Sequence, residues 1–117
     1  MNLLDLAPKA VQAETLLKAL ANRHRLMILC QLHKGEISVS KLQAALGLNQ
    51  SSLSQHLGRL REDGFVKTRR ESQTIYYSLE GSEVPRIIKL LYEIYCAGDC
   101  GPAIEASIKP ASRRKVS

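Results

Sequence analysis

The sequence lacks several features that would place it in other classes of protein. Its 117 residues include no tryptophan, one phenylalanine and four tyrosines. The longest apolar runs, such as residues 26–30, are far too short to span a bilayer. The N-terminus has no basic stretch followed by a long apolar core, as a secretory signal would. Because 44% of the residues are hydrophobic and 24% are charged, we expect one folded cytoplasmic domain without membrane association.

Cysteine is rare, and the three cysteines, Cys30, Cys96 and Cys100, are an odd number. Secreted disulfide scaffolds usually pair all their cysteines, so we expect reduced thiols in a cytoplasmic protein. A Cys-x-x-Cys pair after a strand, which is typical of thiol oxidoreductases, is also missing. We therefore predict no catalytic residue, no cofactor and no enzymatic activity.

The net charge of +6 is concentrated near the C-terminal end. Residues 1–108 carry only +2, and the other +4 comes from Lys109, Arg113, Arg114 and Lys115. Residues 102–117 mix proline, alanine, serine and basic residues without periodicity, which predicts a flexible basic tail behind a folded domain of residues 1–101. The net charge permits a nucleic-acid partner without proving one. The case for nucleic-acid binding therefore depends on where the basic residues lie inside the domain.

Apolar periodicity predicts helices at both ends of this domain. The first covers about residues 8–21, and the second runs to Lys34 after Asn22, which can cap it. The second is apolar nearly all round, so we expect it to be central and buried. A last helix, about residues 84–97, starts near Ser82 and Pro85, ends before Gly98 and carries an apolar stripe of Val84, Ile87, Ile88, Leu91, Ile94 and Tyr95.

Two shorter helices in the middle of the chain are separated by a tight glycine turn. The first starts near Ser38 and is expected to direct four residues inward: Val39, Leu42, Ala45 and Leu46. Gly47 breaks it, and Asn49 can cap a second helix that ends near residues 63–64 and buries Leu53, Leu57 and Leu60. This arrangement predicts a helix-turn-helix.

The segment after Gly64 changes to an alternating pattern. Residues 65–70 and 74–79 predict two strands with Ile75, Tyr77 and Leu79 inward, and residues 71–73 form the tip. Basic side chains lie on or near the exposed end of this hairpin. The predicted fold class is therefore mainly α with a β-hairpin wing, a winged helix-turn-helix.

The helix after Asn49 presents a short, polar and uncharged face at its start. With Leu53 at the centre of the buried side, Ser51, Gln55 and Gly58 point away from the core. Glutamine can bond adenine and serine can bond base edges or phosphates, whereas arginines fix the register on the phosphates. The predicted DNA-binding residues are Gln50, Ser51, Ser52, Ser54, Gln55, Arg59, Arg69, Arg70 and Gln73.

Each of these features also has a simpler interpretation. The serines could form a solvated helix face, and the hairpin arginines could protect an edge strand. His56 lies beside the buried side of its helix, where we expect packing or backbone bonding rather than base contact. A protein that merely dimerises is a further alternative, and it would show no preference among DNA duplexes.

Residues from about 14 to 95 resemble the ArsR family of winged-helix repressors. The most specific match is LNQSSLSQHLGRL at residues 48–60, followed by DGFV at 63–66 and IYYSL at 75–79. The segment LLKALANRHRLMIL at residues 16–29 matches as well. The resemblance implies a homodimer that joins through its first and last helices and binds an inverted-repeat operator in double-stranded DNA until an inducer releases it.

The sensor motifs of this family narrow the choice of inducer. Where its arsenic and cadmium sensors carry Cys-Val-Cys, this chain has serine at Ser38 and Ser40, and hydroxyl groups are poor ligands for soft metals. The last helix also lacks the histidine that the zinc sensors place there. The remaining pair, Cys30 and Cys96, is similar to the thiol-switch branch. That similarity implies that reactive sulfur species or oxidants link the two cysteines through a disulfide or a longer sulfur bridge.

The residues by themselves leave alternatives open for the cysteines. Cys30 lies in an apolar helix, where buried cysteine is usually an inert small hydrophobe. Together, Cys30, His33, Cys96 and Cys100 would offer three sulfurs and one nitrogen, enough for tetrahedral zinc or cadmium. A repressor that responds to zinc, cadmium or arsenic is therefore the alternative function, and Cys100 could also be a spare or inert thiol.

Overall fold

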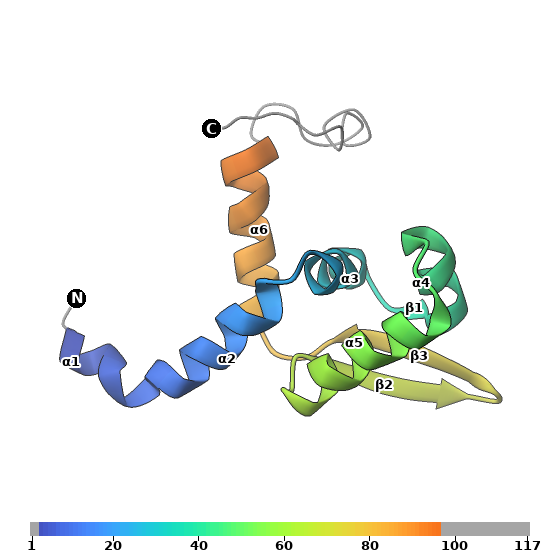
Figure 1. Ribbon diagram of the computed structural model, residues 1–117, viewed down its shortest axis with the longest axis horizontal. Coiled ribbons are helices and arrows are strands. Elements are labelled where there is room, and N and C mark those ends of the chain that lie inside the picture. The colour runs from blue at the N-terminus through green and yellow to red at the C-terminus, as the bar shows by residue number, and fades with distance from the viewer. Residues whose placement is uncertain (1–2, 97–117) are drawn as a thin grey trace. The chain divides into compact units, whose positions relative to one another are not determined.

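Figure 1 shows the computed structural model, which describes residues 3–96 of the chain. The chain divides into two compact units, one ending at Val84 and the other beginning at Pro85. The first unit contains the helix-turn-helix and the hairpin, and the described part of the second is helical. The predicted basic tail, residues 102–117, lies outside the described residues, as do Gly98 and Cys100.

The N-terminal helical segment starts earlier than predicted and is interrupted. It consists of α1 (Leu3–Leu6), the 3₁₀ turn η1 (Ala7–Lys9) and α2 (Ala10–Leu20). Pro8 lies at the start of η1, where its missing N–H and fixed φ suit a first turn but not a helix interior. The expected helix over residues 8–21 therefore begins as a regular α-helix only at Ala10.

Three helices begin where the sequence places a capping side chain. In α3 (Arg23–His33) the amide of Arg25 donates to Asn22 Oδ1 at 3.0 Å, and in α4 (Val39–Leu46) the amide of Lys41 donates to Ser38 Oγ at 3.3 Å. In α5 (Gln50–Glu62) the amide of Ser52 donates to Asn49 Oδ1 at 2.7 Å. Each cap satisfies an amide that the helix itself leaves without a partner, so all three predicted starts are confirmed.

The turn between α4 and α5 is a glycine C-cap. Gly47 has φ +68°, a left-handed conformation that a side chain would strain, and its amide bonds back to the carbonyl of Gln43 at 2.9 Å. This stop allows α5 to begin three residues later with Asn49 as its N-cap. The predicted helix-turn-helix is therefore confirmed.

The sheet contains one strand more than predicted. Strands β2 (Val66–Glu71) and β3 (Thr74–Leu79) form the hairpin, and β1 (Ile37–Ser38) pairs with the other edge of β3, giving the order β1-β3-β2. Glu71, expected at the tip, pairs with Thr74, so the turn contains only Ser72 and Gln73. Residues 75–79 are all half-buried, which replaces the strict alternation expected for them.

The core of the first unit is built from the inward faces of α3, α4 and α5 together with the base of the hairpin. Its fully or nearly buried apolar residues are Ala19, Ile28, Leu29, Leu32, Leu42, Leu53, Leu57, Leu60, Phe65, Val66 and Val84. Two expectations were wrong. Met27 is 39% exposed, so α3 is not buried on all sides, and Ala45, expected to point inward, is exposed on α4.

Helix α6 (Glu83–Cys96) begins at the end of the first unit, and its residues 85–96 are the described part of the second unit. Several apolar side chains on it are exposed, including Leu90, Ile94 and Tyr95 at 51%, 58% and 79%. None of the helices described, from residue 3 to residue 96, is long and apolar enough to cross a membrane.

Candidate nucleic-acid interface

Helix α5 separates a leucine ridge from a polar outer face. Leu53, Leu57 and Leu60 are at most 2% exposed, and this ridge fixes the rotation of the helix on the core. The outer face consists of the exposed residues Gln50, Ser51, Ser54, Gln55, Gly58 and Arg59, with Ser52 half-buried at its edge. The first turns of this face carry hydroxyl and amide groups without charge, which suits close approach to base edges.

A groove of about 520 Å³ lies between α5, the start of α4 and the hairpin. It is lined by Val39, Ser40, Gln43, Gln50, Ser54, Leu57, Gly58, Arg61, Gln73, Thr74, Ile75 and Tyr77. The groove thus brings together three of the predicted DNA-binding residues, Gln50, Ser54 and Gln73, from two separate elements. Its lining includes the apolar side chains of Val39, Leu57 and Ile75, and its polar groups are mostly amides and hydroxyls.

Sequence reasoning did not assign Gln43 or Thr74 to this surface. Both line the groove because α4 contacts β3, while α5 contacts β2, the hairpin partner of β3. A local signal existed for the α5 side, since Gln50, Ser54 and Gly58 are spaced at four-residue steps along one helix face. No local signal could place Gln43 or Thr74 there, because their position depends on contacts between distant segments.

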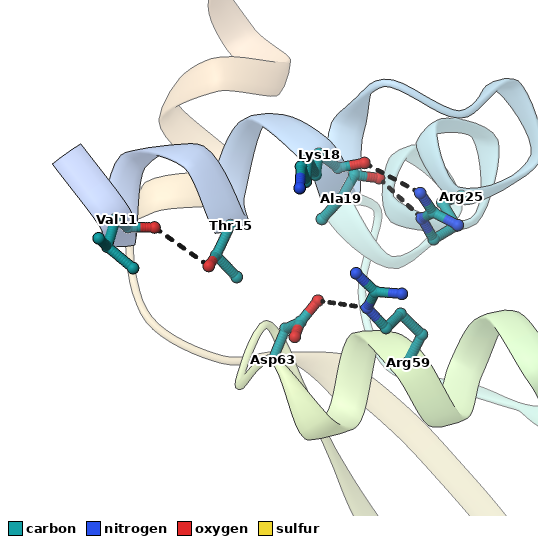
Figure 2. A network of polar contacts seen from close by, with 7 residues as sticks. All are labelled: Val11, Thr15, Lys18, Ala19, Arg25, Arg59 and Asp63. Carbon is teal, nitrogen blue, oxygen red and sulfur yellow. Dashed lines mark hydrogen bonds and ion pairs between the residues drawn. The ribbon is translucent and has the colours of Figure 1, made fainter.

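The two arginines near the end of α5 have different surroundings. Arg59 Nε lies 3.2 Å from Asp63 Oδ2 in an (i, i+4) ion pair, shown in Figure 2, and Arg59 does not line the groove. Arg61 lines the groove and, within residues 3–96, has no ion-pair partner. Of the two arginines that the sequence suggests for phosphate contact, Arg61 is therefore better placed than Arg59 beside the groove.

Arg69 on β2 is held by two carboxylates. Its Nε and Nη2 donate to the two oxygens of Glu36 at 3.0 and 2.9 Å, and its Nη1 donates to Glu71 Oε1 at 3.1 Å. The guanidinium also lies 4.6 Å from the ring centroid of Tyr76. The hydrogen bond from Arg69 lowers the pKa of Glu36 below its ordinary value near 4.5. The neighbouring Arg70 and the tip residue Gln73 are exposed.

Arg25 fixes the junction between α2 and α3. Its Nη2 and Nε donate to the carbonyls of Lys18 and Ala19 at 2.9 and 3.2 Å, as Figure 2 shows. A cation that binds the last carbonyls of a helix satisfies acceptors that the helix leaves open and also stabilises its dipole. Nearby, Thr15 Oγ1 donates to the carbonyl of Val11 at 3.1 Å within α2.

His56 connects α5 to α3. Its ring centroid lies 5.8 Å from that of His24, and the side chain is half-buried, in agreement with the expected packing role. Burial lowers the pKa of His56 below its usual 6.5, and the positive charges of Arg25 and His24 lower it further. The neutral imidazole is therefore favoured at this contact.

The predicted sensor residues fall in different parts of the chain. Cys30 lies near the end of α3 and Cys96 ends α6, and both are half-buried. His33 is exposed at the end of α3, and Cys100 lies outside the described residues. Within residues 3–96, no group of three or more histidine, cysteine, aspartate or glutamate side chains is arranged to hold a metal ion.

Comparison with known proteins identifies the family. The family model described as bacterial regulatory protein, arsR family, matches residues 16–68. The transcriptional activator HlyU of Vibrio cholerae is 50% identical over 96 residues, which cover 82% of this chain and 89% of HlyU. The chain belongs to the ArsR family. A second relative within it, the biofilm growth-associated repressor of Agrobacterium fabrum, is 48% identical over 76% of each chain.

Solved structures of ArsR-family proteins agree with this fold. HlyU from Vibrio cholerae matches with a TM-score of 0.74 at 50% identity, over 77% of this chain and 98% of that one, and another structure of the same protein is described as reduced HlyU. The homodimeric winged helix-turn-helix DNA-binding domain Mb0332 from Mycobacterium bovis matches with a TM-score of 0.69 at 30% identity, over 92% and 93% of the two chains. This ArsR-family chain is a winged helix-turn-helix transcriptional regulator, and its relatives are regulators rather than enzymes.

Proposed function

We propose that this protein is a cytoplasmic repressor that binds an inverted-repeat operator as a homodimer. The observation that carries the proposal is the groove between α5 and the hairpin, lined by Gln50, Ser54, Arg61 and Gln73. In this assignment α5 enters the major groove, where its amide and hydroxyl groups contact base edges. The hairpin follows the neighbouring backbone, where Arg70 contributes charge.

Repression and dimerisation are supported by relatives rather than by the chain alone. The Agrobacterium fabrum relative is named a repressor, whereas HlyU is named an activator, so a promoter-reporter assay has to decide the sign of regulation. The Mycobacterium bovis domain is described as homodimeric. A dimer would place two copies of α5 on half-sites about one helical turn apart, which is why an inverted repeat is expected.

The DNA assignment is tested with the two arginines of α5. Duplexes are first selected from a random library by the wild-type protein, and affinity is then measured over a range of salt concentrations. Arg61→Gln should weaken binding and reduce the slope of log affinity against log salt by about 1.8, because the homodimer loses one phosphate contact in each subunit and each contact contributes about 0.9. Arg59→Gln is the matched control, because its ion pair with Asp63 should keep it from phosphate.

If Arg61→Gln and Arg59→Gln change the salt slope equally, Arg61 does not make the proposed phosphate contact. Failure of the wild-type protein to enrich any duplex would contradict the operator assignment as a whole. It would favour a protein that only dimerises.

We further propose that Cys30 and Cys96 form the inducer-sensing pair. One thiolate takes the outer sulfur of a low-molecular-weight persulfide, and the donor leaves as a thiol. The second thiolate then attacks the Sγ of the first cysteine, the outer sulfur leaves as hydrosulfide, and a disulfide between Cys30 and Cys96 remains. With hydrogen peroxide, the two thiols are oxidised to the same disulfide and the peroxide is reduced to two waters. A donor with an additional sulfur would leave a longer bridge.

The support for this pair is the relation to HlyU, one structure of which is described as reduced. Both side chains are half-buried, so each is partly open to a small reagent. A link between them would join α3, which packs against α5, to α6. Because half-site spacing tolerates little change, such a link can release the operator.

The test is a gel shift with and without glutathione persulfide, followed by mass spectrometry of the intact protein. Wild-type protein should release DNA and lose the mass of two hydrogens for a disulfide, or gain the mass of each inserted sulfur less two hydrogens for a longer bridge. Cys30→Ser and Cys96→Ser should each keep DNA bound, and Cys100→Ser is the matched control that should respond like the wild type. Unchanged release by both single variants would exclude the switch.

The metal-responsive alternative requires Cys30, His33, Cys96 and Cys100 to meet, and no metal-binding cluster is present within residues 3–96. Cys100 lies outside these residues, so this alternative rests on the sequence alone, whereas the thiol pair is also supported by the relation to HlyU. Equilibrium dialysis that showed a stoichiometric zinc or cadmium complex with altered DNA affinity would favour the metal-responsive alternative.

A further inference from the structure

The side chain of Arg69 crosses the sheet from one edge to the other. Arg69 lies on β2, its cross-strand partner Tyr76 lies on β3, and Glu36 directly precedes β1 at the opposite edge. The guanidinium passes over the Tyr76 ring at 4.6 Å and reaches both carboxylate oxygens of Glu36 at 2.9 and 3.0 Å. A single side chain therefore joins all three strands with a two-pronged, charge-assisted contact.

This contact reaches the helix-turn-helix through a very short strand. β1 has only two residues, and its second residue, Ser38, is also the N-cap of α4. With so few ladder bonds, the backbone pairing of β1 with β3 is weak by itself. Glu36 lies two residues before that cap. Its ion pair with Arg69 therefore connects the hairpin to the start of α4.

The guanidinium of Arg69 is already occupied by carboxylates. Glu36 and Glu71 both bond it, and the nearby positive charge of Lys67 acts on Glu36 as well. A DNA phosphate could bind Arg69 only if one of these two ion pairs broke. Arg70, the next residue, is exposed and has no ion-pair partner within the described part of the chain.

From this geometry we infer that Arg69 and Glu36 are positioning residues that set the wing relative to the helix-turn-helix, and that Arg70 makes the phosphate contact from the wing. The inference rests on the proposed function, since it concerns how the wing meets DNA. It replaces the role predicted for Arg69 from sequence, which was a direct DNA contact.

The binding experiment uses Glu36→Gln, Arg69→Gln and, as matched control, Glu71→Gln, with a duplex selected by the wild-type protein. Like Glu36→Gln, Glu71→Gln removes one carboxylate charge that contacts the Arg69 guanidinium. Unlike Glu36→Gln, it leaves the contact between Arg69 and Glu36 in place. Glu36→Gln and Arg69→Gln should each weaken DNA binding about three- to tenfold with an unchanged salt slope. The control should change affinity less than about twofold, and the exchanged pair Glu36→Arg with Arg69→Glu should recover most of the loss.

A second measurement does not depend on DNA. Amide hydrogen exchange in β1 and the facing part of β3 should become faster in Glu36→Gln and Arg69→Gln, while α5 and the Glu71→Gln control stay as in the wild type. If no duplex is selected, the proposed function fails while this measurement still decides the link between the strands. If exchange is unchanged, the positioning role is wrong. It is also wrong if Glu36→Gln binds DNA more tightly and Arg69→Gln lowers the salt slope by about 1.8, which would make Arg69 a phosphate contact in both subunits.

Discussion

At the scale of the residue, Gly58 lowers the stability of α5 but keeps the groove open. It lies inside α5, where glycine costs about 1 kcal/mol relative to alanine, and it lines the groove. A Cβ at this position would meet no atom within 4 Å. We therefore expect Gly58→Ala and Gly58→Leu to raise the free energy of unfolding by roughly 0.5–1 kcal/mol, measured by urea denaturation without DNA.

Although Gly58→Leu should increase stability, it should decrease the affinity for DNA. Leucine at position 58 would fill the groove that the proposed function assigns to DNA, so affinity for a selected duplex should fall at least about tenfold, measured by fluorescence anisotropy. The alanine variant is the control, because it gives the gain in helix propensity with little bulk. A leucine variant that is more stable and binds with wild-type affinity would show that DNA does not enter the groove.

Residue-scale predictions from sequence succeeded where the cause is local. The caps at Asn22, Ser38 and Asn49 were predictable because each bonds an amide three residues further along the chain. The partner of Arg69 was not predictable, since Glu36 is 33 residues away in sequence. The outer face of α5 could therefore be predicted from the sequence. Only the structure shows which arginines form ion pairs, as Arg59 and Arg69 do.

At the scale of the element, the contact of α3 with α5 should make stability depend on pH. The pKa of His56 is lowered by burial and by the charges of Arg25 and His24, so the unfolded chain takes up a proton at higher pH than the folded one. As the pH falls below about 6.5, protonation therefore favours the unfolded state, and stability decreases until the folded-state pKa is passed.

Urea midpoints at about pH 7.5 and 5.5 measure this effect. The wild-type midpoint should be lower at the acid pH, and His56→Gln should show a smaller difference although it is less stable at both values. His33→Gln is the control, because His33 is exposed at the end of α3, and it should follow the wild type. An acid-induced loss that is equally large in His56→Gln would assign the pH dependence to other groups.

Elements were predictable from sequence to different extents. The strong helices and the hairpin were found because apolar periodicity and turn residues mark them within a short window. β1 was missed because two residues carry no periodicity, and its existence depends on pairing with Tyr76 and Tyr77 almost forty positions later. The N-terminal segment was misplaced because Pro8, expected to start a helix, is instead accommodated in a 3₁₀ turn that continues from α1.

At the scale of the whole molecule, the exposed apolar side chains support the proposed homodimer. Leu17 on α2 is 60% exposed and Ile94 on α6 is 58% exposed, each together with apolar neighbours on its helix. Apolar exposure of this extent at both ends of a small domain is typical of surfaces that a partner covers. The family resemblance assigns these same two segments, the first and the last helix, to the subunit interface.

Leu17→Lys and Ile94→Lys should each convert the dimer to a monomer in sedimentation velocity, because a lysine introduced into an apolar interface leaves an unpaired charge there. Affinity for an inverted repeat should then fall by about a hundredfold or more, since two half-sites are no longer bound by linked subunits, while weak binding to a single half-site should remain. Ser82→Lys adds the same charge at an exposed polar position and should stay dimeric. If Ile94→Lys remains a dimer with full affinity for the repeat, the last helix is not part of the interface. The effect of a link through Cys96 on DNA would then have to reach α5 within one subunit, through α3 alone.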